Sequence, residues 1–151
     1  MWREGAEALE VHGQPVSQAW WHGYLRVTLR LRKGGEPVVV MVSHLNPFDP
    51  ILRRIEGSWL RVMMSQTSRG LLVLDANAVA PGDPEPEPYP SRNLPGEPIG
   101  DRTPLAALAE SGLVDVGASF ADLRPTFGYY DHGPTVPRVP LRIDQAWQRH
   151  R

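Results

Sequence analysis

The sequence contains no cysteine and only one lysine among its 151 residues. The absence of cysteine excludes disulfides, thiolate catalysis and cysteine-based zinc sites. No apolar run approaches the roughly 20 residues that a membrane-spanning helix needs. Residues 1–20 also lack the basic-then-apolar order of a secretory signal. These absences predict a cytoplasmic protein that has no membrane partner.

Charge of either sign is not in excess, because the net charge is -1. A balanced charge gives no broad field for duplex DNA, whose binding depends mainly on phosphate contacts. Apart from Lys33, every basic residue other than histidine is an arginine, whose fork suits bidentate contacts to phosphate. The length suits one domain with a sizeable core.

Hydrophobic periodicity predicts a β-hairpin in the first third of the chain. Between Trp20 and Leu31, apolar residues alternate with arginine and threonine, which is typical of a half-buried strand. Residues 33–36 form a glycine-rich turn. Val38–Val42 is a continuous apolar run, which favours a central strand buried on both faces.

The next segment predicts a helix and a second buried strand. Asp49 is a suitable N-cap and Pro50 suits the first helical position. An apolar stripe at helical spacing continues to Met63, and Leu71–Leu74 is a short apolar strand. A single intervening helix is the usual connection between parallel strands, so we expect this strand to lie beside the one at Val38–Val42.

The remaining residues predict a long loop, one more helix and short strands. Residues 80–98 are rich in proline and predict a surface loop. The expected fold class is therefore α/β, with a β-sheet layer covered by helices. The later elements are a helix at Thr103–Ser111 that stops at Gly112, and strands at Leu113–Val116, Phe127–Tyr130 and Val139–Trp147.

Polar residues follow both predicted buried strands directly. His44 ends the first, and Asp75 and Asn77 end the second. In open α/β sheets, sites form where strand ends meet loops. A carboxylate, a carboxamide and an imidazole at one edge suit phosphoester cleavage.

Structural roles for the same residues remain open. His44 could be a surface histidine, and the Asp-x-Asn segment could be a turn former. Arg142 and Asp144 could form an edge-strand ion pair worth little stability. The other histidines have no partner at a recognisable spacing; they are His12, His22, His132 and His150.

Three segments together resemble the endonuclease/exonuclease/phosphatase superfamily, which has the DNase I-like fold. Val38–Pro47 is similar to that family's apolar strand ending in Ser/Thr-His-Leu. Leu71–Asn77 is similar to its Gly-Asp-x-Asn segment, with Leu74 in place of the glycine. Arg142-Ile143-Asp144 resembles its Arg-Ile-Asp segment. The resemblance covers residues 20–147, in the same order and with similar spacing.

The resemblance implies a metal-dependent phosphoester hydrolase built on part of a four-layer α/β (α+β) sandwich. It implies Mg²⁺ or Mn²⁺ as cofactor and a phosphoester substrate, with nucleic acid among the candidates. Asp75 would activate water near the metal, and Asp144 would orient a catalytic histidine. The implied catalytic residues are His44, Asp75, Asn77 and Asp144; the implied substrate-binding residues are His44, Asn77 and Asn46; the implied metal ligand is Asp75.

The sequence also departs from the family pattern at both ends. The family's early asparagine and metal-binding glutamate have no counterpart here, and the chain stops a few residues after Asp144, where the family continues to Ser-Asp-His. We therefore expect residues 1–151 to be the second half of such a domain, a hydrolase that lacks part of its machinery. The alternative is a non-catalytic binding or assembly module, or a gene remnant, that needs a second copy or a complementing chain to complete the fold.

Overall fold

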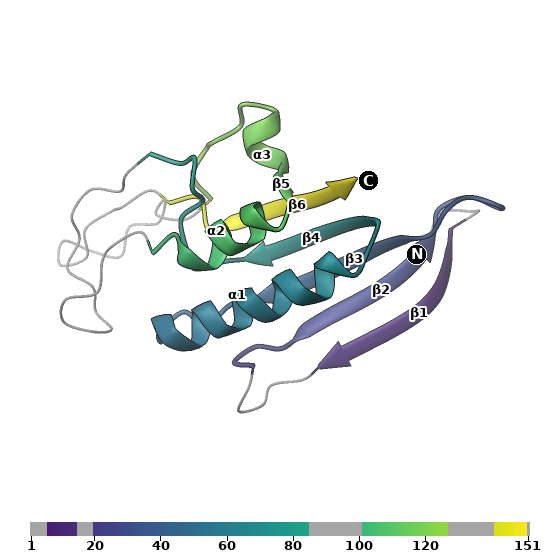
Figure 1. Cartoon of the computed structure of the whole chain (residues 1–151), viewed down its shortest axis with the longest axis horizontal. Coiled ribbons are helices and arrows are strands. Elements are labelled where there is room, and N and C mark those ends of the chain that lie inside the picture. Colours follow the sequence, from purple (N-terminus) through teal and green to yellow (C-terminus); the bar gives the residue numbers. More distant parts are fainter. Residues whose placement is uncertain (1–5, 15–19, 85–100, 127–140, 151) are drawn as a thin grey trace.

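A computed structural model describes residues 6–14, 20–84, 101–126 and 141–150 (Figure 1). These residues form a six-stranded sheet in the order β1-β2-β3-β4-β6-β5, with three helices. The predicted α/β class is therefore confirmed. The elements are β1 (Glu7–Gln14), β2 (Tyr24–Arg30), β3 (Val38–His44), α1 (Pro50–Ser65), β4 (Arg69–Asp75), α2 (Thr103–Glu110), β5 (Val114–Asp115), α3 (Val116–Ser119) and β6 (Asp144–His150).

The sheet brings together strands that are far apart in the chain. β2 and β3 form the predicted antiparallel hairpin. α1 then carries the chain back so that β4 pairs parallel to β3, as predicted. β6 pairs antiparallel to the other side of β4. The register places His44 opposite Asp75, and Asp75 opposite Asp144.

Helix α1 starts where the sequence predicts. Oδ1 of Asp49 accepts hydrogen bonds from the backbone N–H groups of Ile51 at 2.8 Å and Leu52 at 3.1 Å. These bonds satisfy backbone N–H groups that have no partner within the helix. Pro50 lacks a backbone N–H, which is no disadvantage at the first helical position because an N–H there would have no partner within the helix. The side-chain cap therefore fixes the direction in which the chain leaves the end of β3.

The apolar stripe of α1 predicts which face of the helix is buried, and this prediction is wrong in part. Ile51, Ile55 and Trp59 are exposed, whereas Arg53 and Glu56 are buried. The reason is that Arg53 and Glu56 form hydrogen bonds with the backbone of Asn46, in the loop after β3. The side of α1 that carries these two residues therefore faces the protein interior, and part of the apolar stripe is left exposed. Among the described residues, no helix is long and apolar enough to cross a membrane.

Helices α1 and α2 cover one face of the sheet and form the core with it (Figure 1). Gly57 of α1 permits close contact with α2, because a Cβ there would lie 2.9 Å from Cβ of Pro104. The side chains that fill this layer are almost fully buried; they include Met41, Leu60, Met64, Leu72, Leu105, Leu108 and Trp147.

The opposite face of the sheet, here called the open face, is not covered by any described helix (Figure 1). Leu25, Val42 and Val73 lie side by side across it and are 44%, 47% and 39% exposed. The prediction that Val38–Val42 is a strand buried on both faces is therefore wrong, because α1 and α2 cover only one side of the sheet and Val42 lies on the other. Side chains alternate along a strand, so His44 and Asp75, two residues beyond Val42 and Val73, lie on this same face.

Several element predictions fail at the edges of the sheet. β1 was not predicted, because as an exposed edge strand it shows no clear alternation of apolar residues. The predicted strand at Val139–Trp147 instead starts at Asp144. Phe127–Tyr130, Val139–Pro140 and most of the loop at 80–98 lie outside the described residues.

Arg142 does not form the edge-strand ion pair with Asp144 considered above. Its guanidinium instead lies between two carboxylates, with Nη2 2.6 Å from Oδ1 of Asp83 and 2.5 Å from Oδ2 of Asp115. All three side chains are at most 10% exposed. Burial raises the pKa of Asp115, but hydrogen bonds from Arg142 outweigh this effect and leave that pKa below its ordinary value.

We predict that Arg142→Met lowers the free energy of unfolding at pH 7 by about 3–5 kcal/mol, because it leaves two buried carboxylates unpaired. Urea unfolding measures this loss. Arg124→Met is the control, since Arg124 pairs with Asp122 on the surface, and we expect a change below about 1 kcal/mol there.

The same variant has a predicted pH dependence. In the wild type, the lowered pKa of Asp115 contributes stability that is fully present above the ordinary value of 3.8 and is lost as the pH falls through the lowered pKa. In Arg142→Met, burial without the cation raises that pKa, so protonation relieves the unpaired charge. The difference in free energy of unfolding between the wild type and Arg142→Met should therefore become smaller as the pH falls from 7 to 5. A difference that stays constant over this range would contradict this account.

Candidate active site at the strand ends

Three of the predicted catalytic residues lie in one row across the open face. His44 ends β3, Asp75 ends β4 and Asp144 begins β6. Nε2 of His44 lies 3.3 Å from Oδ2 of Asp75, and both side chains are partly accessible. The row exists because parallel strands bring their carboxyl ends to one edge and β6 enters from the same edge.

His22 joins this group, although its spacing in the sequence indicates no partner. Its ring stacks on that of His44, with centroids 3.9 Å apart and planes 5° apart. The hairpin register contains a signal that could have found it. Tyr24 pairs with Ser43, so the residues just before Tyr24 must lie beside those just after Ser43.

The carboxyl group of Asp75 has a raised pKa. Burial is the main cause, and the negative charge of Asp144 adds to it. The imidazole of His44, the backbone N–H of Asn77 and the imidazole of His22 oppose the shift without cancelling it. Burial therefore disfavours the charged form of Asp75 more than its neighbours favour it, and a cation at this place would stabilise that form.

Asn77 lies just outside the row and also shapes the turn that follows β4. Its backbone N–H donates to Oδ1 of Asp75 at 3.1 Å, which is the turn-forming role left open by the sequence. Its Nδ2 donates to the carbonyl of Leu45 at 3.0 Å. The backbone of Asn77 has φ 44, a conformation that asparagine tolerates better than most residues. One of the two amide hydrogens remains for a ligand.

A buried carboxylate holds the loops around the site. Glu56 is 1% exposed and accepts hydrogen bonds from the backbone N–H groups of Asn46 at 2.6 Å and Trp21 at 2.8 Å. Oδ1 of Asn46 in turn accepts from the N–H groups of Phe48 and Asp49, both at 2.8 Å. Asn46 is itself 1% exposed. These contacts make Asn46 part of the scaffold of the site, and its predicted role in substrate binding stays a prediction.

A pocket of about 380 Å³ borders the other end of the row. Arg124, Thr126 and Asp144 are among its lining residues. Oγ1 of Thr126 accepts the backbone N–H groups of Ile143 at 3.2 Å and Asp144 at 3.0 Å, which fixes the start of β6. The row thus has space beside it for a substrate group.

The described residues contain no cluster of three or more His, Cys, Asp or Glu side chains that could hold a metal ion. The row still offers two carboxylates, on Asp75 and Asp144, which are hard oxygen ligands. Mg²⁺ is commonly bound by one or two carboxylates together with phosphate oxygens and water. These residues therefore fit a shared site, with part of the coordination coming from a substrate, and do not form a complete protein cage.

Comparison with known proteins gives matches in structure only. No family model and no curated protein sequence match this chain. D. rerio TDP2 complexed with single strand DNA product is 17% identical with a TM-score of 0.58, over 98% of this chain and 55% of that one. A mannosyl-6-phosphatase from Bacteroides thetaiotaomicron is 12% identical with a TM-score of 0.64, over 97% and 54%.

A third solved structure is an endonuclease/exonuclease/phosphatase family protein, also from Bacteroides thetaiotaomicron. It is 12% identical to this chain with a TM-score of 0.62, over 97% of this chain and 52% of that one. The chain thus spans about half the length of these proteins. Identities this low show the fold and leave the activity to be proposed. The chain therefore has the fold of about half of these proteins, as its resemblance to the DNase I-like fold predicts.

Proposed function

We propose that this chain provides the His44, Asp75, Asn77 and Asp144 part of a phosphoester hydrolase site. The observation that carries the proposal is the register that sets His44, Asp75 and Asp144 side by side on one face of the sheet. Structural roles alone do not require two carboxylates and two imidazoles at one partly accessible edge. The structural matches to a mannosyl-6-phosphatase and to an endonuclease/exonuclease/phosphatase family protein support the same reaction class.

Each residue has a role that its position allows. Asp75 orients an attacking water and accepts its proton, since its carboxylate lies at the centre of the row. His44 donates a hydrogen bond to a phosphoryl oxygen and thereby stabilises negative charge that develops there. Asn77 donates its remaining amide hydrogen to the same phosphate without adding like-charge repulsion. The predicted role of Asp144 in orienting a further histidine stays a prediction.

The cofactor is proposed to be Mg²⁺ or Mn²⁺. Asp75 and Asp144 would hold the ion together with oxygens of the bound phosphate. When bound, the ion would neutralise charge on the phosphate and on the two carboxylates. The remaining predictions, a cytoplasmic location and completion by a second copy or another chain, are kept as predictions.

We predict that Asp75→Asn lowers the rate of phosphodiester hydrolysis by about 10²–10⁴-fold, the usual contribution of a positioned acid or base. The assay follows release of p-nitrophenol from bis(p-nitrophenyl) phosphate with Mg²⁺ or Mn²⁺. Asp122→Asn is the matched control, because Asp122 is a surface carboxylate paired with Arg124. Wild-type protein without activity, or activity that survives Asp75→Asn, would count against the proposal.

A second prediction concerns the metal. Removing divalent ions with EDTA should abolish hydrolysis, and adding Mg²⁺ or Mn²⁺ should restore it. Asp144→Asn should raise the metal concentration needed for half-maximal activity by about tenfold or more, since it removes one of two charged ligands. Titration of activity against metal concentration measures this shift. Equal titration curves for Asp144→Asn and the wild type would exclude Asp144 as a ligand.

A further inference from the structure

We propose that Trp21 and Phe48 form a stacking platform for a nucleobase of a single-stranded nucleic acid, beside the proposed hydrolytic row. The identity of the reaction rests on the proposed function above, whereas the platform itself rests on separate observations. Those observations are the exposure of two facing aromatic rings, their connection to the row, and the buried group that holds them.

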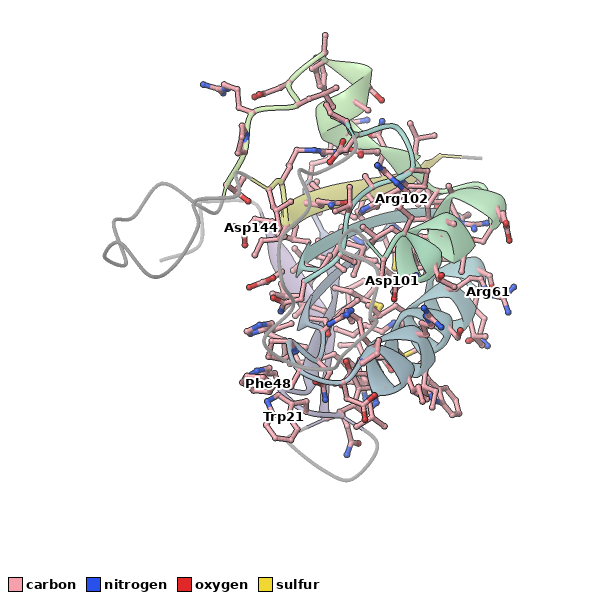
Figure 2. All side chains as sticks on the ribbon, turned by 90° about the vertical axis from the view of Figure 1, so that its left-hand side faces the viewer. Trp21, Phe48, Arg61, Asp101, Arg102 and Asp144 are labelled. Atoms are coloured by element: carbon pink, nitrogen blue, oxygen red, sulfur yellow. The ribbon has the colours of Figure 1, made fainter. Side chains whose placement is uncertain are left out.

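The two rings are exposed although they touch each other. Their centroids lie 5.6 Å apart at an interplanar angle of 78°, an edge-to-face pair. Trp21 is still 46% exposed and Phe48 55%. Figure 2 shows them next to each other, on the same side of the molecule as Asp144. An edge-to-face pair leaves ring surface free, so a planar group can stack on it.

A continuous series of rings connects this pair to the row. The ring of Trp21 lies 6.3 Å from that of His22, which stacks on His44, and His44 contacts Asp75. In a nucleotide, one sugar separates the planar base from the phosphodiester. A nucleic acid whose phosphate lies at Asp75 can therefore place a neighbouring base on Trp21 and Phe48.

Both rings are attached to backbone that the protein fixes from inside. Glu56 accepts the N–H of Trp21 and the N–H of Asn46, and the side chain of Asn46 accepts the N–H of Phe48. One buried carboxylate thus positions both halves of the pair. Rings held in this way lose little freedom when a ligand stacks on them, which favours binding.

The charge of the protein and the accessibility of the bases favour a single strand over a duplex. The net charge is only -1, and Asp75 and Asp144 lie in the row, so phosphate contacts alone would give weak binding. A duplex keeps its base faces stacked inside, where these rings have no access. A single strand exposes a π-face on every base, and stacking on aromatic side chains is the usual source of its affinity.

The test measures binding of fluorescein-labelled octathymidylate by anisotropy, with EDTA present so that no hydrolysis occurs. The comparison ligand is an abasic oligomer of the same length and charge. We expect the wild type to bind octathymidylate about tenfold more tightly than the abasic oligomer, a base-dependent gain typical of stacking. Trp21→Ala and Phe48→Ala should each remove most of this gain, and Trp21→Phe should retain part of it.

Two control variants make the result specific. Trp59→Ala changes an exposed tryptophan of α1 in a different hollow, one lined also by Arg61, which lies away from Trp21 and Phe48 in Figure 2, and should leave the gain intact. Asp75→Asn should also leave it intact, while lowering the rate of hydrolysis, measured separately with Mg²⁺, by about 10²–10⁴-fold. Equal affinity for both oligomers, no detectable binding of octathymidylate, or an unchanged gain in both Trp21→Ala and Phe48→Ala would overturn the platform.

The outcomes separate this inference from the proposed function. If octathymidylate binds more tightly than the abasic oligomer but no Asp75-dependent hydrolysis is found, the platform is supported and the hydrolase is rejected. Hydrolysis that depends on Asp75 without a base-dependent gain would do the reverse. If a protein partner covers these rings instead, the gain is absent and the platform for nucleic acid is rejected.

Discussion

The parallel pairing of β3 with β4 is the constraint on which the rest of the structure depends. It aligns the carboxyl ends of two central strands, so His44 and Asp75 meet at one edge. The crossover through α1 is what permits this pairing, and α1 begins correctly because Asp49 caps it. From the same helix, Glu56 reaches back to fix the loops that carry Trp21 and Phe48. One connection therefore positions both the polar row and the aromatic pair.

Much of this arrangement could be predicted from the sequence. The continuous apolar runs that precede His44 and Asp75 indicate central strands, and polar residues directly after them indicate a strand-end site. The Asp49-Pro50 pair predicts the start of α1 to the residue. These signals are local, since periodicity and capping act over a few neighbouring residues. The family resemblance added Asp144, whose position depends on β6, a strand that local patterns located only approximately.

The rest depended on contacts between distant segments. The stack of His22 on His44 follows from hairpin register, which the sequence contains only implicitly. The partners of Arg142 come from a loop and from the end of β5, so spacing along the chain could not identify them. The buried side of α1 was misjudged because Arg53 and Glu56 look like surface residues until their backbone partners are known. Buried polar groups are tolerated when such bonds satisfy them.

The position of β6 has a consequence for the order in which the molecule folds. β2, β3, α1 and β4 follow one another closely, so their contacts close short loops and can form early. β6 pairs with β4 only after the long intervening segment has been brought back, which costs more chain entropy. His44 and Asp75 can therefore be adjacent while Asp144 is still absent from the row. The row of His44, Asp75 and Asp144 is therefore expected to be completed late in folding, after β2, β3, α1 and β4 have come together.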